Sequence, residues 1–143
     1  MVENKKVILS IRFWHPSMKP KDIINNINLI PNATQTVCEN YKLLDGNKIN
    51  KINKETYVAF AFYKSENNDV ANAIENANSY LNDKICFLKK FKQTGGRCEY
   101  YITIVSEREY IFILTSETIK VCSDLGIEIS VELYADLKKN KSD

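Results

Sequence analysis

The sequence predicts one α+β domain, in which helices pack on a mostly antiparallel sheet. The clearest observation is the segment 110–134, YIFILTSETIKVCSDLGIEISVELY, which has the pattern of a strand, a helix and a second strand. A second observation is that period-two apolar patterns alternate with helical ones along the whole chain. The predicted order, β-α-β-β-α(α)-β-β-α-β, begins with the ferredoxin-like βαββαβ pattern and adds a βαβ-like unit. We place the single domain at 1–137 and a flexible tail at 138–143.

Two strands and a helix are predicted before residue 39. In the first strand, 6–15, apolar residues alternate with others, and two apolar residues on its second face suggest that the chain partly covers that face. Pro20 suits the first turn of a short helix, where its missing amide proton leaves no hydrogen bond unmade. Pro31 ends this helix, and a strand follows at 33–38.

The polar segment 39–55 is the least structured part of the prediction. Asp45-Gly46 signals a turn, and the remainder is rich in asparagine and lysine with isolated isoleucines. We interpret it as a solvated hairpin loop, and the alternative is that its lysines contact phosphate (Lys48, Lys51, Lys54). A strand at 56–63 follows it.

A long helix occupies the middle of the chain. Apolar residues recur at helical spacing over 70–81, after Asn67, Asn68 and Asp69, which are alternative caps. We expect the helix to bend near residues 82–83 and to resume as KICFLKKFK, ending at the glycine pair 95–96. Four lysines make this second piece basic (Lys84, Lys89, Lys90, Lys92). The pattern is typical of a helix whose lysine stems cover apolar rims, and alternatively of a module that binds nucleic acid or an anionic surface through 84–92.

The last third of the chain carries the most regular patterns. Strands are predicted at 100–105 and 110–114, and Thr115-Ser116 offers a cap for the helix that Gly126 ends. In the final strand, alternate apolar residues are expected to face the core (Ile127, Ile129, Val131, Leu133). The residues between them then point the other way (Glu128, Ser130, Glu132, Tyr134).

The charge is unevenly distributed, although the net charge is only +2. Residues 1–54 hold nine Lys/Arg and four Asp/Glu, a balance of 9 − 4 = +5, whereas residues 106–137 hold two and seven, a balance of 2 − 7 = −5. One interpretation is an ordinary solvated surface. The other is an acidic face offered to a basic partner, which would speed association.

The composition indicates a soluble cytoplasmic protein. No apolar run approaches the roughly 20 residues of a membrane span, and the first residues lack the cleavage site of a signal peptide. The four cysteines have no CxxC spacing, so we expect them to be reduced.

No pattern for catalysis, a metal or a cofactor is found. His15 is the one histidine, which excludes a histidine-based metal cluster. We interpret it as a residue at the edge of a loop, while the sequence leaves open a meeting with one of the cysteines. The four glycines form no phosphate-binding loop, and Glu107 and Glu109 flank Arg108 as a self-neutralising turn would. We therefore expect a protein without enzymatic activity.

The two ends of the chain resemble the bacterial uncharacterised domain family numbered 4279. The matching segments are VILSIRFWH, KPKDIINNINLIPNATQT and SETIKVCSDLGIEISVELY; the glycine expected before Ile30 is Leu29, and an expected central tryptophan is absent, with Phe60 nearby. The resemblance implies no catalytic residue. Small domains of this kind are similar to immunity proteins that neutralise a toxin.

We therefore expect a non-catalytic module that binds a protein partner, such as a basic toxin domain, and needs no cofactor or metal. The expected contact residues are acidic or aromatic and lie in the C-terminal part (Glu109, Glu128, Glu132, Tyr134). The alternative is the nucleic-acid or anionic-surface module described for 84–92. We expect neither nucleic acid nor a membrane as the actual partner.

Overall fold

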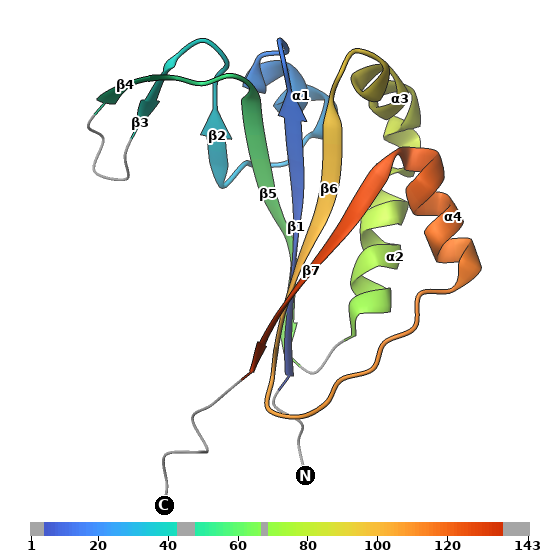
Figure 1. Ribbon diagram of the computed structural model, residues 1–143. Helices are drawn as coiled ribbons and strands as arrows, with labels where there is room; N and C mark the ends of the chain where they lie inside the picture. Colours follow the sequence, from blue (N-terminus) through green and yellow to red (C-terminus); the bar gives the residue numbers. More distant parts are fainter. Residues whose placement is uncertain (1–4, 43–47, 67–68, 136–143) are drawn as a thin grey trace, which may run out of the picture.

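The computed structural model describes residues 5–42, 48–66 and 69–135. It has the predicted α+β architecture, in which helices pack on a mostly antiparallel five-stranded sheet (Figure 1). The elements in chain order are β1 (Lys5–His15), α1 (Pro20–Ile27), β2 (Ala33–Gln35), β3 (Asn40–Lys42), β4 (Lys48–Ile52), β5 (Thr56–Glu66), α2 (Val70–Leu81), the 3₁₀ turn η1 (Asn82–Lys84), α3 (Ile85–Gln93), β6 (Arg97–Ser106), α4 (Ser116–Leu125) and β7 (Ile127–Ala135). The tail expected at 138–143 lies outside the described residues.

The main sheet has the order β2-β5-β1-β6-β7. Its first four strands pair antiparallel and, with α1 and α2, have the connectivity and order of the ferredoxin-like βαββαβ unit. β7 joins β6 in parallel through the crossover helix α4, with Cys98 opposite Ile127 and Ser106 opposite Ala135. The appended unit is therefore β6-α4-β7, which shares β6 with the core of the sheet.

The prediction of a strand at 110–114 is wrong. The chain there alternates between half-buried and exposed side chains, as the sequence pattern indicates, but it forms no ladder with the sheet. Its inward residues pack on the core (Tyr110, Phe112, Leu114). β7 lies beside β6, and the segment crosses to α4 as an extended connection that pairs with no strand of the described sheet.

Helix ends follow the sequence signals closely. Pro20 opens α1, Asp69 caps α2 by accepting a hydrogen bond from the backbone N–H of Asn72 at 2.8 Å, and Thr115 caps α4. Gly126 ends α4 in the left-handed conformation at φ 73°, which glycine adopts without strain. The expected bend between the two middle helices is η1.

The segment around 36–55 is more ordered than a loop. β2 ends at Gln35, earlier than predicted, because the backbone N–H of Val37 turns to the hydroxyl of Thr56. β3 and β4 then pair as a separate two-stranded antiparallel sheet. The turn expected at Asp45-Gly46 lies outside the described residues.

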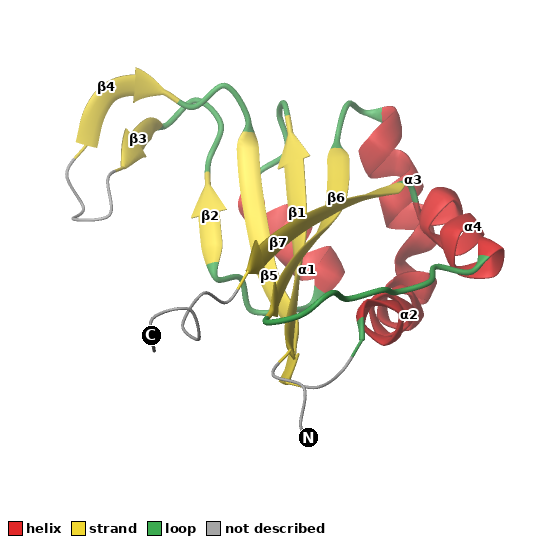
Figure 2. Cartoon of the chain, turned by 60° about the horizontal axis from the view of Figure 1, so that its bottom comes forward, coloured by secondary structure: helices red, strands yellow, loops and turns green. Residues whose placement is uncertain are grey.

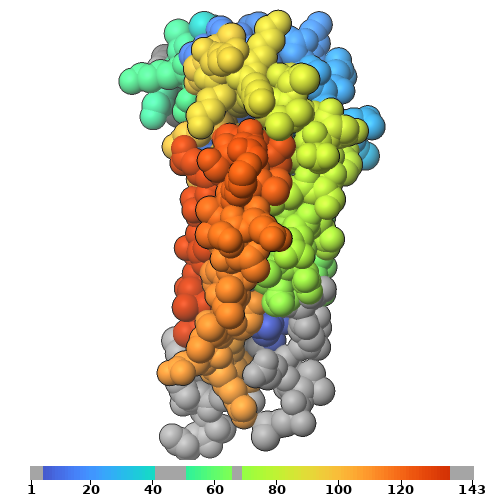
Figure 3. Space-filling view, turned by 90° about the vertical axis from the view of Figure 1, so that its right-hand side faces the viewer, coloured from blue at the N-terminus to red at the C-terminus, as the bar shows by residue number. Residues whose placement is uncertain are grey.

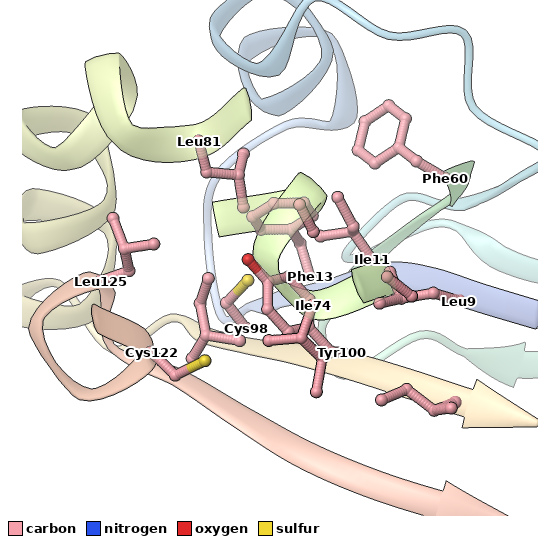
Figure 4. Packing of buried hydrophobic residues seen from close by; sticks show 14 of the residues in the cluster. Leu9, Ile11, Phe13, Phe60, Ile74, Leu81, Cys98, Tyr100, Cys122 and Leu125 are labelled. Atoms are coloured by element: carbon pink, nitrogen blue, oxygen red, sulfur yellow. The ribbon is translucent and has the colours of Figure 1, made fainter. Parts of the chain in front are cut away.

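The helices cover one face of the main sheet (Figure 2). Alternate side chains of β1 and β6 belong to the same apolar cluster as the inward residues of the four helices (Val7, Leu9, Ile11, Phe13, Cys98, Tyr100, Ile102, Ile104). Figure 4 shows residues of this core, which include Leu9, Phe13, Phe60, Ile74 and Leu125. The other face carries the half-buried members of the same alternation, which positions the candidate site.

A buried polar cluster joins α2, β6 and α4 inside this core. The hydroxyl of Tyr100 donates to Asn78 Oδ1 at 2.7 Å, and Asn78 Nδ2 lies 3.5 Å from Cys122 Sγ. Burial raises the pKa of both the Tyr100 hydroxyl and the Cys122 thiol, so each keeps its proton at neutral pH. The amide of Asn78 therefore satisfies groups that would otherwise be buried without a partner.

Changing Asn78→Ala is expected to lower the free energy of unfolding by about 1–3 kcal/mol, because the Tyr100 hydroxyl loses its acceptor. Adding Tyr100→Phe removes the stranded hydroxyl, so the double variant should be more stable than Asn78→Ala alone. Denaturant unfolding of the three proteins measures this. A double variant no more stable than Asn78→Ala would show that the stranded Tyr100 hydroxyl is not what lowers the unfolding free energy of Asn78→Ala.

His15 ends β1, and its side chain is only 2 % exposed. Nδ1 accepts hydrogen bonds from the backbone N–H groups of Ser17 and Met18 at 3.0 and 2.9 Å. Nε2 therefore carries the proton, which it donates to the Thr94 hydroxyl at 2.8 Å. The imidazole joins the start of the β1–α1 connection to the end of α3, and its place is structural.

Burial lowers the pKa of His15 below its usual value. The unfolded chain takes up a proton near pH 6.5, before the folded chain does, so this contribution to stability is present above about pH 6.5 and is lost as the pH falls toward the lower folded-state pKa. His15→Asn, which does not titrate there, should show a shallower loss of unfolding free energy between about pH 7 and 5. Denaturant midpoints across that range measure it, and equal slopes for the two proteins would contradict the assignment.

Candidate functional site

The face of the sheet opposite the helices is the candidate site. Along β1 and β6, the residues between the buried ones are half-buried or exposed, and none of the described helices packs over them. The register brings side chains from β1, β6 and β7 together on this face, with Arg12 opposite Glu99 and Glu99 opposite Glu128. The face divides by charge, because β7 contributes carboxylates and β1 contributes cations.

Three carboxylates and a tyrosine lie along the β6–β7 half, which we name the acidic strip (Glu99, Glu128, Glu132, Tyr134). The side chain of Ser130 donates to Glu99 Oε2 at 2.8 Å, so these residues share one face. Tyr134 is half exposed and its hydroxyl donates to Glu132 Oε1, which raises the pKa of the tyrosine. Glu128 is exposed and makes no ion pair within 4 Å among the described residues.

The expected contact residues are brought only partly together. Glu128, Glu132 and Tyr134 share the acidic strip, which sequence reasoning placed on one plane. Glu109 instead lies in the connection after β6, three residues past Ser106, which pairs with Ala135 at the end of β7. It is exposed at that end of the sheet, on no strand.

The expectation that all four alternate residues of β7 face a core is wrong for two of them. Ile127 is buried and Ile129 packs on the core, but Val131 and Leu133 are 47 % and 66 % exposed. The strand order places β7 at the edge of the sheet, and Figure 1 shows that it runs from the end of α4 away from the helices. Half of β7 therefore presents apolar side chains on its helix side and charged ones on its open side.

Sequence reasoning missed an arginine–aromatic cluster on the other half of the open face. The guanidinium of Arg12 lies 3.7 Å from the ring centre of Tyr101, and that of Arg97 lies 4.2 Å from Trp14. Trp14 also packs on Tyr57, with ring centres 5.3 Å apart. The signal in the sequence was the pair of apolar residues on the second face of the first strand, which predicted that this face is partly covered. The cover comes from side chains of neighbouring strands in the sheet. These stacked arginines already lie over two of the rings, so the cluster is built from internal contacts.

The basic helix offers fewer free cations than its sequence suggests. Lys84 is mostly buried, and its Nζ lies 3.1 Å from Asp83 Oδ1 and over the ring of Tyr80. Lys89, Lys90 and Lys92 are exposed on α3, as are Lys51 and Lys54 near β4. The apolar side of α3, which includes Leu88 and Phe91, is in the core.

We predict that the protein does not retain a single-stranded DNA oligonucleotide in about 50 mM salt, where phosphate contacts are strongest. Filter binding of a labelled oligonucleotide measures this. Retention that disappears in Lys89→Glu/Lys90→Glu would contradict the prediction and support the alternative role of 84–92.

Polar side chains also line a hollow away from the open face of the sheet. A hollow of about 670 Å³ lies between α2 and α4, and its lining, which includes Glu75, Asn82 and Glu117, contains neither histidine nor cysteine. Within the described ranges, no three His, Cys, Asp or Glu side chains gather as metal ligands. No helix in the described part of the chain is long and apolar enough to cross a membrane.

Comparison of the whole chain with protein-family models, with curated proteins and with solved structures gave no match in any of the three.

Proposed function

We propose that this chain is a non-catalytic protein-binding module, an immunity protein that neutralises a cognate basic toxin by stoichiometric binding in the cytoplasm. The observation that carries the proposal is the acidic strip on the open side of β6 and β7. β7 combines the carboxylates and the tyrosine of this strip on its open side with exposed apolar residues on its other side, at the edge of the sheet. Each of these features has a distinct task in binding.

The carboxylates supply attraction at a distance. The ion pairs Lys84–Asp83 and Lys120–Asp124 lie on the helices, and within the described part of the chain neither Glu128 nor Glu132 is in an ion pair. A surface with uncompensated charge of one sign accelerates encounter with an oppositely charged partner and disfavours like-charged proteins. A toxin domain that acts on nucleic acid would carry the complementary basic surface.

The aromatic and apolar side chains supply the contact that slows dissociation. Tyr134 is 51 % exposed on the open side of β7, and Leu133, which is 66 % exposed, points to the other side of the same strand. A few well-buried residues, often tyrosine, tryptophan or arginine, carry most of the binding energy of a typical interface. We therefore assign anchoring to Tyr134 and steering to Glu128 and Glu132.

The test is neutralisation in cells. The reading frame adjacent to the gene of this chain is expressed from an inducible promoter in a bacterial host, with and without this chain. We expect growth arrest on induction, and recovery when this chain is present. The matched control for the variant Glu128→Lys/Glu132→Lys is Glu75→Lys/Asp124→Lys. It makes the same charge change on the helices and should still restore growth.

Growth arrest that this chain leaves unrelieved would contradict the proposed function. Equal relief by Glu128→Lys/Glu132→Lys and by the unchanged protein would keep neutralisation but remove the acidic strip from it.

A further inference from the structure

The outer edge of β7 carries unpaired backbone groups. β7 is nine residues long and ends the strand order, with β6 as its one partner in the described sheet. No other described backbone group hydrogen-bonds to 127–135. Every second residue of an edge strand directs its N–H and C=O outward, where they can pair with another extended chain. The opposite edge is the three-residue β2, which is too short to be an equivalent template.

The two sides of this edge differ in chemistry. On the open side lie Glu128 and Glu132, and on the helix side lie Val131 and Leu133. Figure 3 shows β7 in red at the margin of the molecule, on the same face as the orange connection that carries exposed Ile111 and Ile113. A strand added here would place its own alternate side chains beside carboxylates on one side and beside apolar groups on the other.

We infer that the partner adds an extended segment to the free edge of β7, and that this segment alternates Lys or Arg with apolar residues. This inference rests on the proposed function and specifies how the partner is held. The backbone hydrogen bonds provide a contact independent of sequence, while the alternation selects the segment. Its cations lie beside Glu128 and Glu132, and its apolar side chains cover Val131 and Leu133.

The charge pattern favours such a segment over a second copy of this chain. A two-fold pairing of β7 with itself must be antiparallel. Centred on Ser130, it sets Glu128 directly opposite Glu132 of the other copy; centred on Ile129 or Val131, it makes carboxylates of the two copies diagonal neighbours. Like charges in these positions destabilise a strand pair, whereas lysine or arginine there stabilises it.

The test uses two capped nine-residue peptides as probes, KVKVKVKVK and EVEVEVEVE. We expect the lysine peptide to bind at least tenfold more tightly than the glutamate peptide, and Glu128→Lys/Glu132→Lys to reverse this preference. Glu75→Lys/Asp124→Lys should keep the original preference. A preference that both variants lose equally would show that the peptide responds only to net charge, and would overturn the inference.

Amide hydrogen exchange read by NMR locates the contact. In the free protein, alternate amides of 127–135 should exchange fast, and the lysine peptide should protect this set, spaced two residues apart. Amides that stay fast with the peptide bound would overturn strand addition. Protection already present in the free protein, together with a dimer in sedimentation, would show that a second copy holds the edge.

The same exchange experiment on the complex with the neighbouring toxin separates this inference from the proposed function. Neutralisation with unprotected outer amides of β7 would retain the function and overturn strand addition. Protection by the lysine peptide without any neutralisation would retain the peptide site and overturn the role as an immunity protein.

Discussion

Replacing Phe13 by alanine is expected to lower the free energy of unfolding by about 3–5 kcal/mol, the largest effect on stability foreseen here. Phe13 is fully buried at the centre of the core, on β1, the middle strand of the sheet. Its ring makes edge contacts with Phe60 and Phe91, at centroid distances of 5.8 and 5.6 Å. Alanine would leave a cavity between two rings that rigid strands and a helix hold in place.

Denaturant unfolding followed by circular dichroism measures this loss. Phe13→Leu should lose less than Phe13→Ala, because it fills part of the space. Ile111→Ala, at a side chain that is 85 % exposed, should change stability by under about 0.5 kcal/mol. A loss below about 1 kcal/mol for Phe13→Ala would mean that the aromatic cluster does not hold the helices on the sheet.

Reversing both carboxylates, Glu128→Lys/Glu132→Lys, is expected to weaken binding to the neighbouring toxin by well over tenfold, or more than about 1.4 kcal/mol. The two lysines would replace attraction by repulsion at the same positions of the acidic strip. Most of the change in association rate should vanish at high salt, where charges separated by more than a Debye length are screened. Surface plasmon resonance at two salt concentrations measures both effects.

The unfolding free energy of this variant should stay within about 0.5 kcal/mol of the original, since Glu128 is exposed and neither residue forms an ion pair with another described residue. Glu75→Lys/Asp124→Lys is again the control for net charge. If the toxin's affinity for Glu128→Lys/Glu132→Lys is unchanged, the interface lies elsewhere on the protein. If the variant unfolds, these carboxylates are structural.

Local signals in the sequence determined the elements that depend on local chemistry. Pro20, Asp69, Thr115 and Gly126 act at helix ends through their own backbone and side-chain geometry, so their positions can be read directly. The alternation of apolar residues in β1 and β6 likewise indicates that one face of each strand is covered. The fold class followed from these patterns.

The arrangement of edges could not be read from the same patterns. The side chains of 110–114 alternate in burial, yet a strand also needs a hydrogen-bonded partner, and β7 rather than this segment lies beside β6. Val131 and Leu133 were expected inside because alternation cannot show how far a helix extends over a sheet. Both errors concern non-local geometry, which one short window of sequence does not contain.

The candidate site was predicted to a similar extent. Glu128, Glu132 and Tyr134 share a face because the two-residue period of a strand requires it. The contribution of Glu99 depends on the parallel register of β6 with β7, and the stacking of Arg12 on Tyr101 depends on the neighbouring strand. Such cross-strand neighbours depend on which strands lie side by side in the sheet. The sequence predicts only the order of the elements along the chain.

The most direct test of the account is a titration of the toxin's activity with this chain. If neutralisation is stoichiometric, activity should fall linearly and reach its minimum at one equivalent, and dissociation of the complex should return active toxin. Complete loss of activity at a small fraction of an equivalent, with toxin that stays inactive after separation, would show that this chain acts as a catalyst and would contradict the account.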